Sequence, residues 1–219
     1  MTPERFHRIR KVLSRRQPDL TVLLENVHKP HNFAAVLRTA DAVGLFSAHA
    51  VVPDRQLRTS LLSASGSDKW VDVHVWGTIE EGLEQIQKED LRVLAAEPGF
   101  DAIDYRSIDF TRPTAIIFGQ EKDGLSDTAL GAADEHIRIP MAGFVTSLNV
   151  SVAAAIILFE AMRQRLAVGL YQQSALAPEV FQRTLFEWTY PQLAEHCRRR
   201  GASYPRLDED GELLDPMPK

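Results

Sequence analysis

The sequence predicts an α/β fold, a parallel sheet with helices on both of its faces. Short, continuous apolar runs, typical of strands buried on both sides, alternate along the chain with segments of helical periodicity. Such alternation is typical of strand–helix–strand units, whose strands run parallel. The 219 residues, 44% hydrophobic and 25% charged, have the size and composition of one main globular domain with appended pieces.

The expected elements of this domain follow one another without an internal repeat. Apolar composition predicts six strands, at residues 20–27, 48–52, 71–75, 91–96, 114–118 and 136–139. Helical spacing predicts helices at residues 33–43, 78–88, 126–133 and from 150 onward. Residues 28–32 are expected to form a polar loop, and residues 101–112 have no clear periodicity.

Capping residues define several of these helix ends. Gly44 is suited to the left-handed position after the first helix of the domain, and Thr78 with Glu81 forms a capping box. Ser126 is a candidate N-cap, as is either Ser147 or Asn149. These signals predict where helices begin and end.

The two ends of the chain form helical extensions, so we expect three parts: residues 1–19, 20–168 and 169–219. Thr2 and Pro3 begin an amphipathic first helix whose apolar face comprises Phe6, Ile9 and Val12–Leu13. Six basic and two acidic residues among the first 20 make it about +4. Helices at 178–188 and from Pro191 follow, and the last ends in Arg198, Arg199 and Arg200. Such basic runs are either solvated faces, complements to a helix dipole, or contacts to a polyanion.

Several classes of protein are disfavoured by composition and motifs. The net charge of −5 argues against an entirely basic protein, and Cys197 alone forms no intrachain disulfide and no cysteine zinc site. No run approaches the ~20 apolar residues of a membrane span, and no secretory signal is visible, so we expect a cytoplasmic protein. GxGxxG, GxxxxGK[ST] and HExxH motifs are absent, and the histidines lack metal-ligand spacing. We therefore expect no metal.

Polar residues follow three of the predicted strands, at residues 32–38, 119–124 and 141–149. Each group alone is consistent with ordinary turn chemistry. In an open α/β sheet, however, ligands bind beyond the carboxyl ends of the strands. The three groups together therefore predict one composite site.

These segments resemble the three motifs of the SPOUT RNA methyltransferases. They read NxxAVLRTADAVG at 32–44, GQEKDGL at 119–125 and IPMxGxxxSLNVSVAAAI at 139–156, within a resemblance that covers residues 20–166. The stretch RRQPDLTVLLENVHKPHN at 15–32 and the YP-containing C-terminal helices are similar to the TrmH branch, the tRNA guanosine-2′-O-methyltransferases. The resemblance implies a C-terminal deep trefoil knot and a homodimer whose sites are completed by both chains.

The implied cofactor is S-adenosyl-L-methionine, bound in the knot region largely through backbone groups. The implied cofactor-binding positions are Ala96, Gly119, Ile139, Met141, Leu148 and Asn149. Ala96 stands where some relatives have a hydroxyl residue, so a side-chain hydrogen bond would be missing there if that contact is not to the backbone.

The implied reaction is methyl transfer to the ribose 2′-hydroxyl of a D-loop guanosine, guanosine-18, in tRNA. The resemblance assigns Arg38 to activating that hydroxyl, with Asn32, Glu121, Ser147 and Asn149 completing the catalytic set. A guanidinium, with a pKa above ~12, is a poor free base, so we expect Arg38 to stabilise the developing alkoxide. Six helical residues separate Asn32 from Arg38 by ~1.7 turns, so Asn32 is expected in the loop before the helix. The alternative for Arg38 is a surface ion pair with Asp41 or Glu25.

A tRNA needs cationic partners for its phosphates. The expected RNA-binding residues lie in the first helix, in the loop after the second strand and at the end of the last helix: Arg8, Arg15, Arg16, Arg55, Arg58, Arg198, Arg199 and Arg200. Methylation of ribosomal RNA and a non-catalytic RNA-binding module are the alternatives. Many ribosomal relatives have a larger N-terminal RNA-binding domain, whereas only ~20 residues precede the first strand here, so we expect a tRNA substrate.

Overall fold

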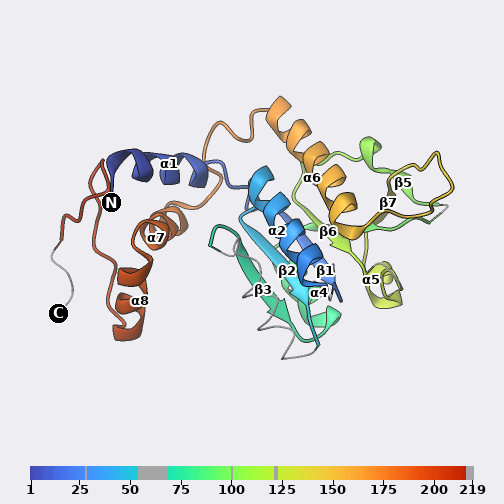
Figure 1. Ribbon diagram of the computed structural model, residues 1–219, viewed down its shortest axis with the longest axis horizontal. Helices are drawn as coiled ribbons and strands as arrows, with labels where there is room; N and C mark the ends of the chain where they lie inside the picture. Colours follow the sequence, from blue (N-terminus) through green and yellow to red (C-terminus); the bar gives the residue numbers. More distant parts are fainter. Residues whose placement is uncertain (28, 54–68, 100, 121–122, 216–219) are drawn as a thin grey trace. The chain divides into compact units, whose positions relative to one another are not determined.

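The computed structural model describes residues 1–27, 29–53, 69–99, 101–120 and 123–215. These residues form two compact units, Gln17–Leu170 and a second unit that joins Met1–Arg16 with Tyr171–Lys219. Figure 1 labels their helices and strands. The predicted site residues Arg55, Arg58 and Glu121 lie outside the described residues.

The larger unit is built on one sheet of seven strands, all parallel, in the order β3-β2-β1-β6-β4-β7-β5. The parallel sheet predicted from the apolar runs is therefore confirmed. The strands are β1 Leu20–Glu25, β2 Ser47–Val51, β3 Asp72–Trp76, β4 Arg92–Ala96, β5 Ile103–Asp104, β6 Thr114–Phe118 and β7 Glu135–Arg138. The sequence did not predict β5, because a two-residue strand is too short to show any periodicity.

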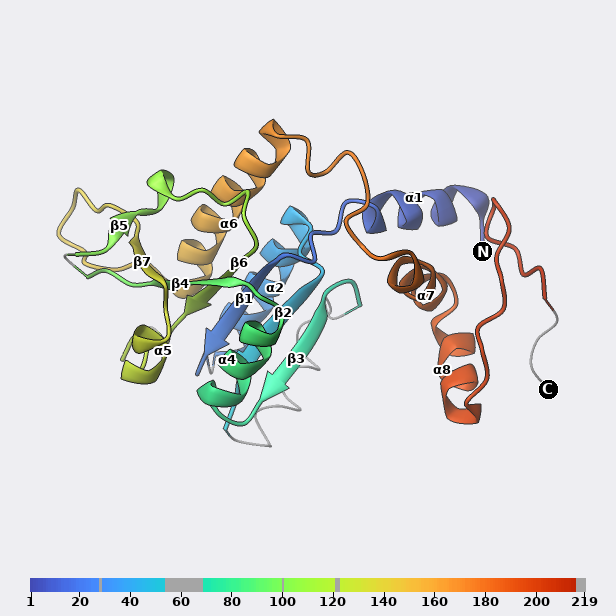
Figure 2. The same cartoon turned by 180° about the vertical axis from the view of Figure 1, so that it is seen from behind.

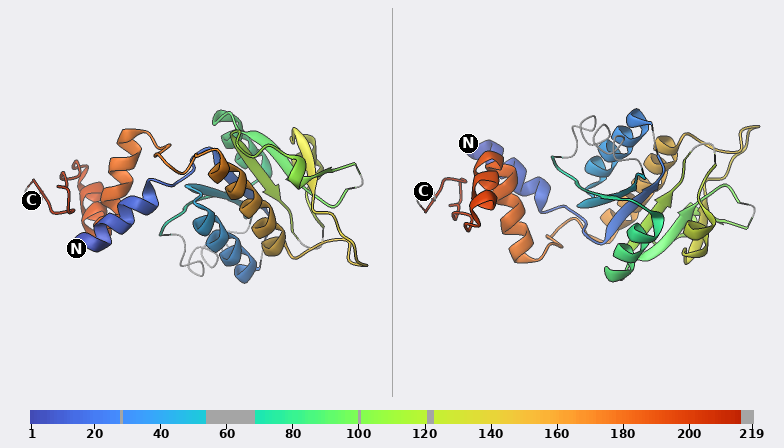
Figure 3. Two further views of the ribbon diagram at one scale, coloured as in Figure 1. Left: turned by 90° about the horizontal axis from the view of Figure 1, so that it is seen from above. Right: turned by 90° about the horizontal axis from the view of Figure 1, so that it is seen from below.

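Helices cover both faces of this sheet, as predicted. α2 (Pro30–Val43) and α6 (Val150–Ala167) lie side by side on one face, which Figure 1 and Figure 3 show. α4 (Ile79–Lys88) covers the opposite face, seen in Figure 2, and α5 (Asp127–Gly131) contributes to the same cluster of buried side chains. Along β1, Val22 and Leu24 point to the first face and Leu23 to the second, because side chains alternate across a strand.

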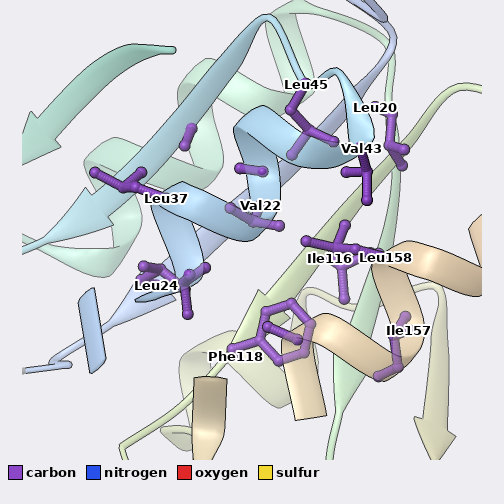
Figure 4. Close-up of a cluster of buried hydrophobic side chains, with 14 of the residues drawn as sticks. Leu20, Val22, Leu24, Leu37, Val43, Leu45, Ile116, Phe118, Ile157 and Leu158 are labelled. Carbon is purple, nitrogen blue, oxygen red and sulfur yellow. The ribbon is translucent and has the colours of Figure 1, made fainter. Parts of the chain in front are cut away.

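The larger core lies between the sheet and the α2–α6 pair (Figure 4). Strand residues Ile116 and Phe118 pack there with Leu37 of α2 and with Ile157 and Leu158 of α6. Each such side chain, when fully buried, stabilises the fold by about 1.5–3 kcal/mol. This packing holds the start of α2 and the start of α6 next to the carboxyl ends of the central strands.

Arg165 ties α6 to the base of the sheet. Its side chain is fully buried and donates to Asp19 Oδ1 at 2.6 Å, to the Phe110 carbonyl at 2.8 Å and to Gln17 Oε1 at 3.1 Å. A buried guanidinium is tolerated only when its donors are satisfied in this way. Removal of the Asp19 carboxylate would leave this buried charge without its ion-pair partner and so destabilise the unit.

Capping explains most helix boundaries, with one correction. Gly44 has φ 85° at the end of α2, and the Thr78 hydroxyl accepts the Glu81 N–H, both as predicted. The loop predicted at residues 28–32 is wrong in part, because α2 begins at Pro30. Proline is favoured in the first turn, where its missing N–H leaves no helical hydrogen bond unmade. Asn32 therefore lies in the helix itself.

The second unit contains α1 (Pro3–Leu13), α7 (Pro178–Thr189) and α8 (Pro191–Arg200). α1 packs on α7, and its residues Phe6, Ile9 and Leu13 are buried as predicted. Val12 was predicted on the same apolar face but is 40% exposed, because it lies about 100° from Leu13 around the helix.

No helix in the described part of the chain combines the length and apolarity needed to cross a bilayer.

Candidate active site

A cavity of about 470 Å³ lies at the carboxyl ends of β4, β6 and β7. The residues that follow each strand form its walls, and the first turns of α6 close it on one side; the wall segments are 96–98, 118–120, 123–125, 137–139, 141 and 146–148. Two of the three polar groups predicted to form one site, those after β6 and β7, therefore meet at this cavity. Its volume is in the range of small-molecule and cofactor sites.

Five of the six predicted cofactor-binding residues line this cavity. They are Ala96, Gly119, Ile139, Met141 and Leu148. Gly119 has a clear steric role, because a Cβ added there would lie 2.3 Å from the backbone of Gly124. The absence of a side chain thus lets two backbone segments approach and shape the cavity floor.

The lining fits S-adenosyl-L-methionine in its chemistry as well as its size. Apolar side chains such as Phe118, Ile137 and Ile157 suit an adenine ring, and the cavity also has charged residues of both signs, Glu97 and Arg138 among them. A ligand that carries an ammonium, a carboxylate and a ribose diol finds complementary groups of each kind here. Among the described residues no cluster of histidine, cysteine and carboxylate side chains could hold a metal ion.

Asn149, the sixth predicted residue, begins α6 and contacts α2. Its Oδ1 accepts the Ser151 N–H at 2.9 Å, and its Nδ2 donates to Asn32 Oδ1 at 3.1 Å. Asn32 is only 3% exposed. Two predicted catalytic residues, distant in sequence, are thus hydrogen-bonded to each other, and Asn149 rather than Ser147 caps the helix. Ser147 lies on the cavity wall.

Arg38 lies on a different face of α2 from Asn32. It is exposed, and within the described residues its guanidinium has no hydrogen bond and no ion pair. The expectation that Asn32 precedes the helix is wrong, but the two residues do not share a face, as six helical positions require. The alternative ion pair with Glu25 is excluded, because Glu25 is buried and accepts the Ser126 N–H at 2.9 Å. The structure does not bring Arg38 into the Asn32–Asn149 cluster.

Large apolar side chains are exposed in the loop after β7 and along α6. Phe144 and Val145, in the loop after β7, are 106% and 60% exposed. Along α6, Val152, Phe159 and Leu166 recur every seven residues and are 46%, 47% and 52% exposed. Every seventh residue of a helix returns to nearly the same face, so these three form a continuous apolar stripe.

The predicted RNA-binding arginines fall into different environments. Arg8 and Arg15 are exposed on α1 and directly after it. Arg16 does not fit the prediction, because it is 1% exposed and its guanidinium lies 5.2 Å from the centre of the Trp188 ring. A cation stacked on an aromatic face inside this unit stabilises packing and is shielded from phosphates.

At the end of α8, Arg198 pairs with Glu187 and Glu195, and Arg199 pairs with Glu195. Arg200 is exposed. The basic run that ends this helix is therefore partly neutralised by carboxylates of α7 and α8.

Sequence reasoning missed one polar pair at the cavity. His136 on β7 contacts Glu97, which follows β4, with 2.6 Å between Nδ1 and Oε1. This contact raises the pKa of His136. The two residues are 39 positions apart, and nothing in the local pattern distinguishes them from ordinary strand-end residues.

Comparison with known proteins places this site in a family. Residues 19–159 match the model of the SpoU rRNA Methylase family, and residues 163–216 match the model of the SpoU rRNA methylase C-terminal region. The chain is 48% identical to the tRNA (guanosine(18)-2′-O)-methyltransferase of Escherichia coli K12, over 97% of this chain and 94% of that protein. The enzyme of the same name from Thermus thermophilus is 53% identical, over 85% of this chain and 96% of its own.

Solved structures agree with these sequence relationships. The A. aeolicus TrmH/SpoU tRNA modifying enzyme superposes with a TM-score of 0.77 at 36% identity, covering 86% of this chain and 96% of its own. The SpoU methyltransferase AviRb from Streptomyces viridochromogenes, solved in complex with the cofactor AdoMet, has a TM-score of 0.61 at 29% identity, covering 69% and 62%. The chain belongs to the SpoU rRNA methylase family.

Proposed function

We infer that this protein transfers a methyl group from S-adenosyl-L-methionine to the ribose 2′-hydroxyl of guanosine-18 in tRNA. This inference rests on the similarity of nearly the whole chain to enzymes named for that reaction. It is supported by a cavity that the family motifs line. Ribosomal RNA is the second candidate, because the matching family model is named for it. Relatives that match both units of this chain are named for tRNA, which favours the first.

The chemistry requires a positioned electrophile and an activated hydroxyl. When bound, S-adenosyl-L-methionine supplies a methyl group on a sulfonium. Its methionyl and nucleoside parts would be held by the walls around Gly119, Ile139 and Leu148. The chain's own work is then to exclude water, to align the hydroxyl with the methyl group, and to stabilise the negative charge that grows on the oxygen.

Arg38 is suited to the last of these tasks. A guanidinium keeps its proton, so it acts as a hydrogen-bond donor and a charge rather than as a base. Its exposure and its lack of a partner among the described residues leave its donors available for the ribose hydroxyl and a neighbouring phosphate. The Asn32–Asn149 hydrogen bond would keep the starts of α2 and α6 in fixed positions relative to each other.

A second copy of the chain would complete the assembly. The α6 stripe of Val152, Phe159 and Leu166, with Phe144 and Val145 nearby in sequence, is exposed apolar surface of the kind that marks an interaction site. We propose a homodimer that buries this stripe and places each Arg38 near a cavity of the other copy. The same proposal includes the deep trefoil knot, which is supported by the position of β7 between β4 and β5.

The dimer is tested by changing the stripe. Phe159→Glu places a charge in the proposed interface, so light scattering should show a monomer and methyl transfer should be lost. Val12→Glu makes the same change at an exposed apolar residue of α1, and it should leave the oligomeric state unaltered. Wild-type protein that is monomeric at micromolar concentration would contradict the proposal.

Phosphate contacts are proposed to come mainly from α1. Arg8, Arg10 and Lys11 are exposed there and form no ion pair within the described residues, whereas Arg198 and Arg199 are already paired. Unpaired cations release condensed counterions from RNA without first breaking an internal pair. A tRNA substrate also supports the proposal that the protein is cytoplasmic.

One assay tests the function directly. A tRNA transcript is incubated with the protein and labelled S-adenosyl-L-methionine, and nuclease fragments are mapped by mass. One 2′-O-methylguanosine, at position 18, is the expected product. Methylation of a ribosomal RNA fragment with no methylation of tRNA would favour the second candidate. Absence of both activities, with no heat of cofactor binding in calorimetry, would indicate a non-catalytic RNA-binding module.

A further inference from the structure

His136 lies between two hydrogen-bond acceptors. Its Nδ1 is 2.6 Å from Glu97 Oε1, and its Nε2 is 3.2 Å from the carbonyl oxygen of Leu130. A carbonyl oxygen carries no proton, and neither does an ionised carboxylate. A neutral imidazole has one N–H, so it can satisfy only one of these contacts, whereas an imidazolium donates to both. The geometry therefore favours a protonated His136.

Glu97 is held in one orientation on the cavity wall. Its backbone N–H donates to the Ile137 carbonyl at 3.0 Å. Its carboxylate lies beside Gly99, where an added Cβ would be 2.8 Å from Oε1. Gly99 thus leaves the space that the carboxylate occupies. Only Oε1 is engaged, because within the described residues no group donates to Oε2. The result is a fixed carboxylate with one free oxygen at the cofactor cavity.

We propose that Glu97 binds the cofactor, accepting a hydrogen bond at its free oxygen from a ribose hydroxyl or the ammonium of S-adenosyl-L-methionine, and that His136 is its positioning residue. The proposal rests on the proposed function, since it names a further ligand contact at the same cavity. An ionised acceptor forms hydrogen bonds roughly twice as strong as a neutral one. Glu97 would therefore add a charged contact to a site otherwise expected to bind largely through backbone groups.

This arrangement makes cofactor affinity depend on pH. Glu97 raises the pKa of His136, so the imidazolium persists above the usual range, and deprotonation at higher pH removes one of its two hydrogen bonds. Glu97 then loses its fixed orientation, and affinity falls as pH rises. Among the described residues, two other charged groups of these strands and their flanks have partners: Glu135 pairs with Arg92, and Asp134 accepts the Val93 N–H. The other charged residues on the described part of the cavity wall are Asp123 and Arg138.

The test is calorimetric binding of S-adenosylhomocysteine, the reaction product, from about pH 6 to about pH 9, which spans imidazole titration. Glu97→Gln keeps the shape but removes the charge, and the Kd should rise about tenfold. His136→Ala should weaken binding similarly and abolish the pH dependence. His136→Asn offers an amide N–H in place of Nδ1–H, so it should restore affinity with a flat pH profile. That rescue would not follow from a merely structural role.

A second ligand identifies the donor. 5′-Methylthioadenosine retains the ribose but lacks the ammonium, so an equal loss in Glu97→Gln for both ligands assigns a hydroxyl. A loss confined to S-adenosylhomocysteine assigns the ammonium. Unchanged Kd values in Glu97→Gln, with wild-type affinity independent of pH, would overturn the inference and leave the proposed function intact. Wild-type protein that binds neither ligand would contradict the proposed function itself.

Discussion

The side-chain amide of Asn149 donates a hydrogen bond of 3.1 Å to Asn32, 117 positions away in the chain. The other end of the same amide caps α6 by accepting the Ser151 N–H. Because the cap fixes Oδ1 toward Ser151, Nδ2 must face Asn32, and the atom it meets there must be an acceptor. One asparagine thus defines the start of α6 and joins it to the first turn of α2.

Because Asn32 and Asn149 are hydrogen-bonded, we expect substitutions at the two positions to have non-additive effects on the free energy of unfolding. Asn149→Ala removes the cap and the Asn32 contact, and should cost about 1–3 kcal/mol; Asn149→Asp keeps the cap and should cost less. In a double-mutant cycle with Asn32→Ala, urea unfolding should yield a coupling energy of about 0.5–1.5 kcal/mol. Strictly additive losses would show that the two side chains do not interact in solution.

Arg38→Ala should separate catalysis from folding. The side chain is exposed, so the free energy of unfolding should change by no more than about 0.5 kcal/mol, and cofactor affinity should be unaltered. Loss of a donor to the developing alkoxide should lower methyl transfer at least about 100-fold. Arg38→Lys, which keeps the charge but not the forked donors, should retain part of the activity. Wild-type turnover in Arg38→Ala would remove the residue from the mechanism.

Gly119→Ala should close the cavity. The added Cβ would lie 2.3 Å from the Gly124 backbone, so the backbones of Gly119 and Gly124 must move apart, with loss of cofactor binding and of about 1–3 kcal/mol of stability. Gly131→Ala is the matched control, because no atom lies within 4 Å of its Cβ position and alanine favours the helix. Calorimetry with S-adenosylhomocysteine and thermal unfolding distinguish the two variants. Equal behaviour would mean that the close approach at Gly119 has no role.

The α1 cations should control the salt dependence of tRNA binding. Replacing Arg10 by alanine should weaken binding uniformly across tRNA sequences and reduce the slope of log K against log salt by about 1. Arg199→Ala should have a smaller effect, because that guanidinium already pairs with Glu195. Filter binding at several salt concentrations provides the slopes. A larger effect of Arg199→Ala than of the Arg10 change would indicate that the phosphate-binding surface lies on α8 instead.

Buried His49 should make stability fall in mild acid. Burial, with the nearby His74 adding to it, lowers the pKa of His49 from 6.5 to about 4, while Trp76 donates to its Nδ1. Below pH 6.5 the His49 imidazole is protonated in the unfolded chain but still neutral in the folded one. The free energy of unfolding therefore declines down to about pH 4, by on the order of 3 kcal/mol. His49→Asn keeps an acceptor for Trp76 and does not titrate. Urea unfolding at about pH 7 and about pH 4.5 should therefore differ less in that variant than in wild type.

Local pattern was enough to predict much of this fold. Strands buried on both faces are apolar throughout, so the strands around Val22 and Ile116 were recognisable without knowing their neighbours. Caps are equally local, and Thr78 and Gly44 were assigned from residues within one helical turn. Parallel strands end at one edge of a sheet, which allowed distant motif residues such as Gly119 and Leu148 to be placed at one site.

The tertiary structure decided which partner each polar group meets. Periodicity indicates which face of a helix is buried, but it does not reveal that Arg16 is stacked on Trp188 or that Asn32 meets Asn149. The same limit applies to the pairing of Glu97 with His136 across two strands. Residues far apart in sequence are brought together only when the sheet is assembled, because a hydrogen bond depends on a few ångströms of three-dimensional distance that no local pattern contains.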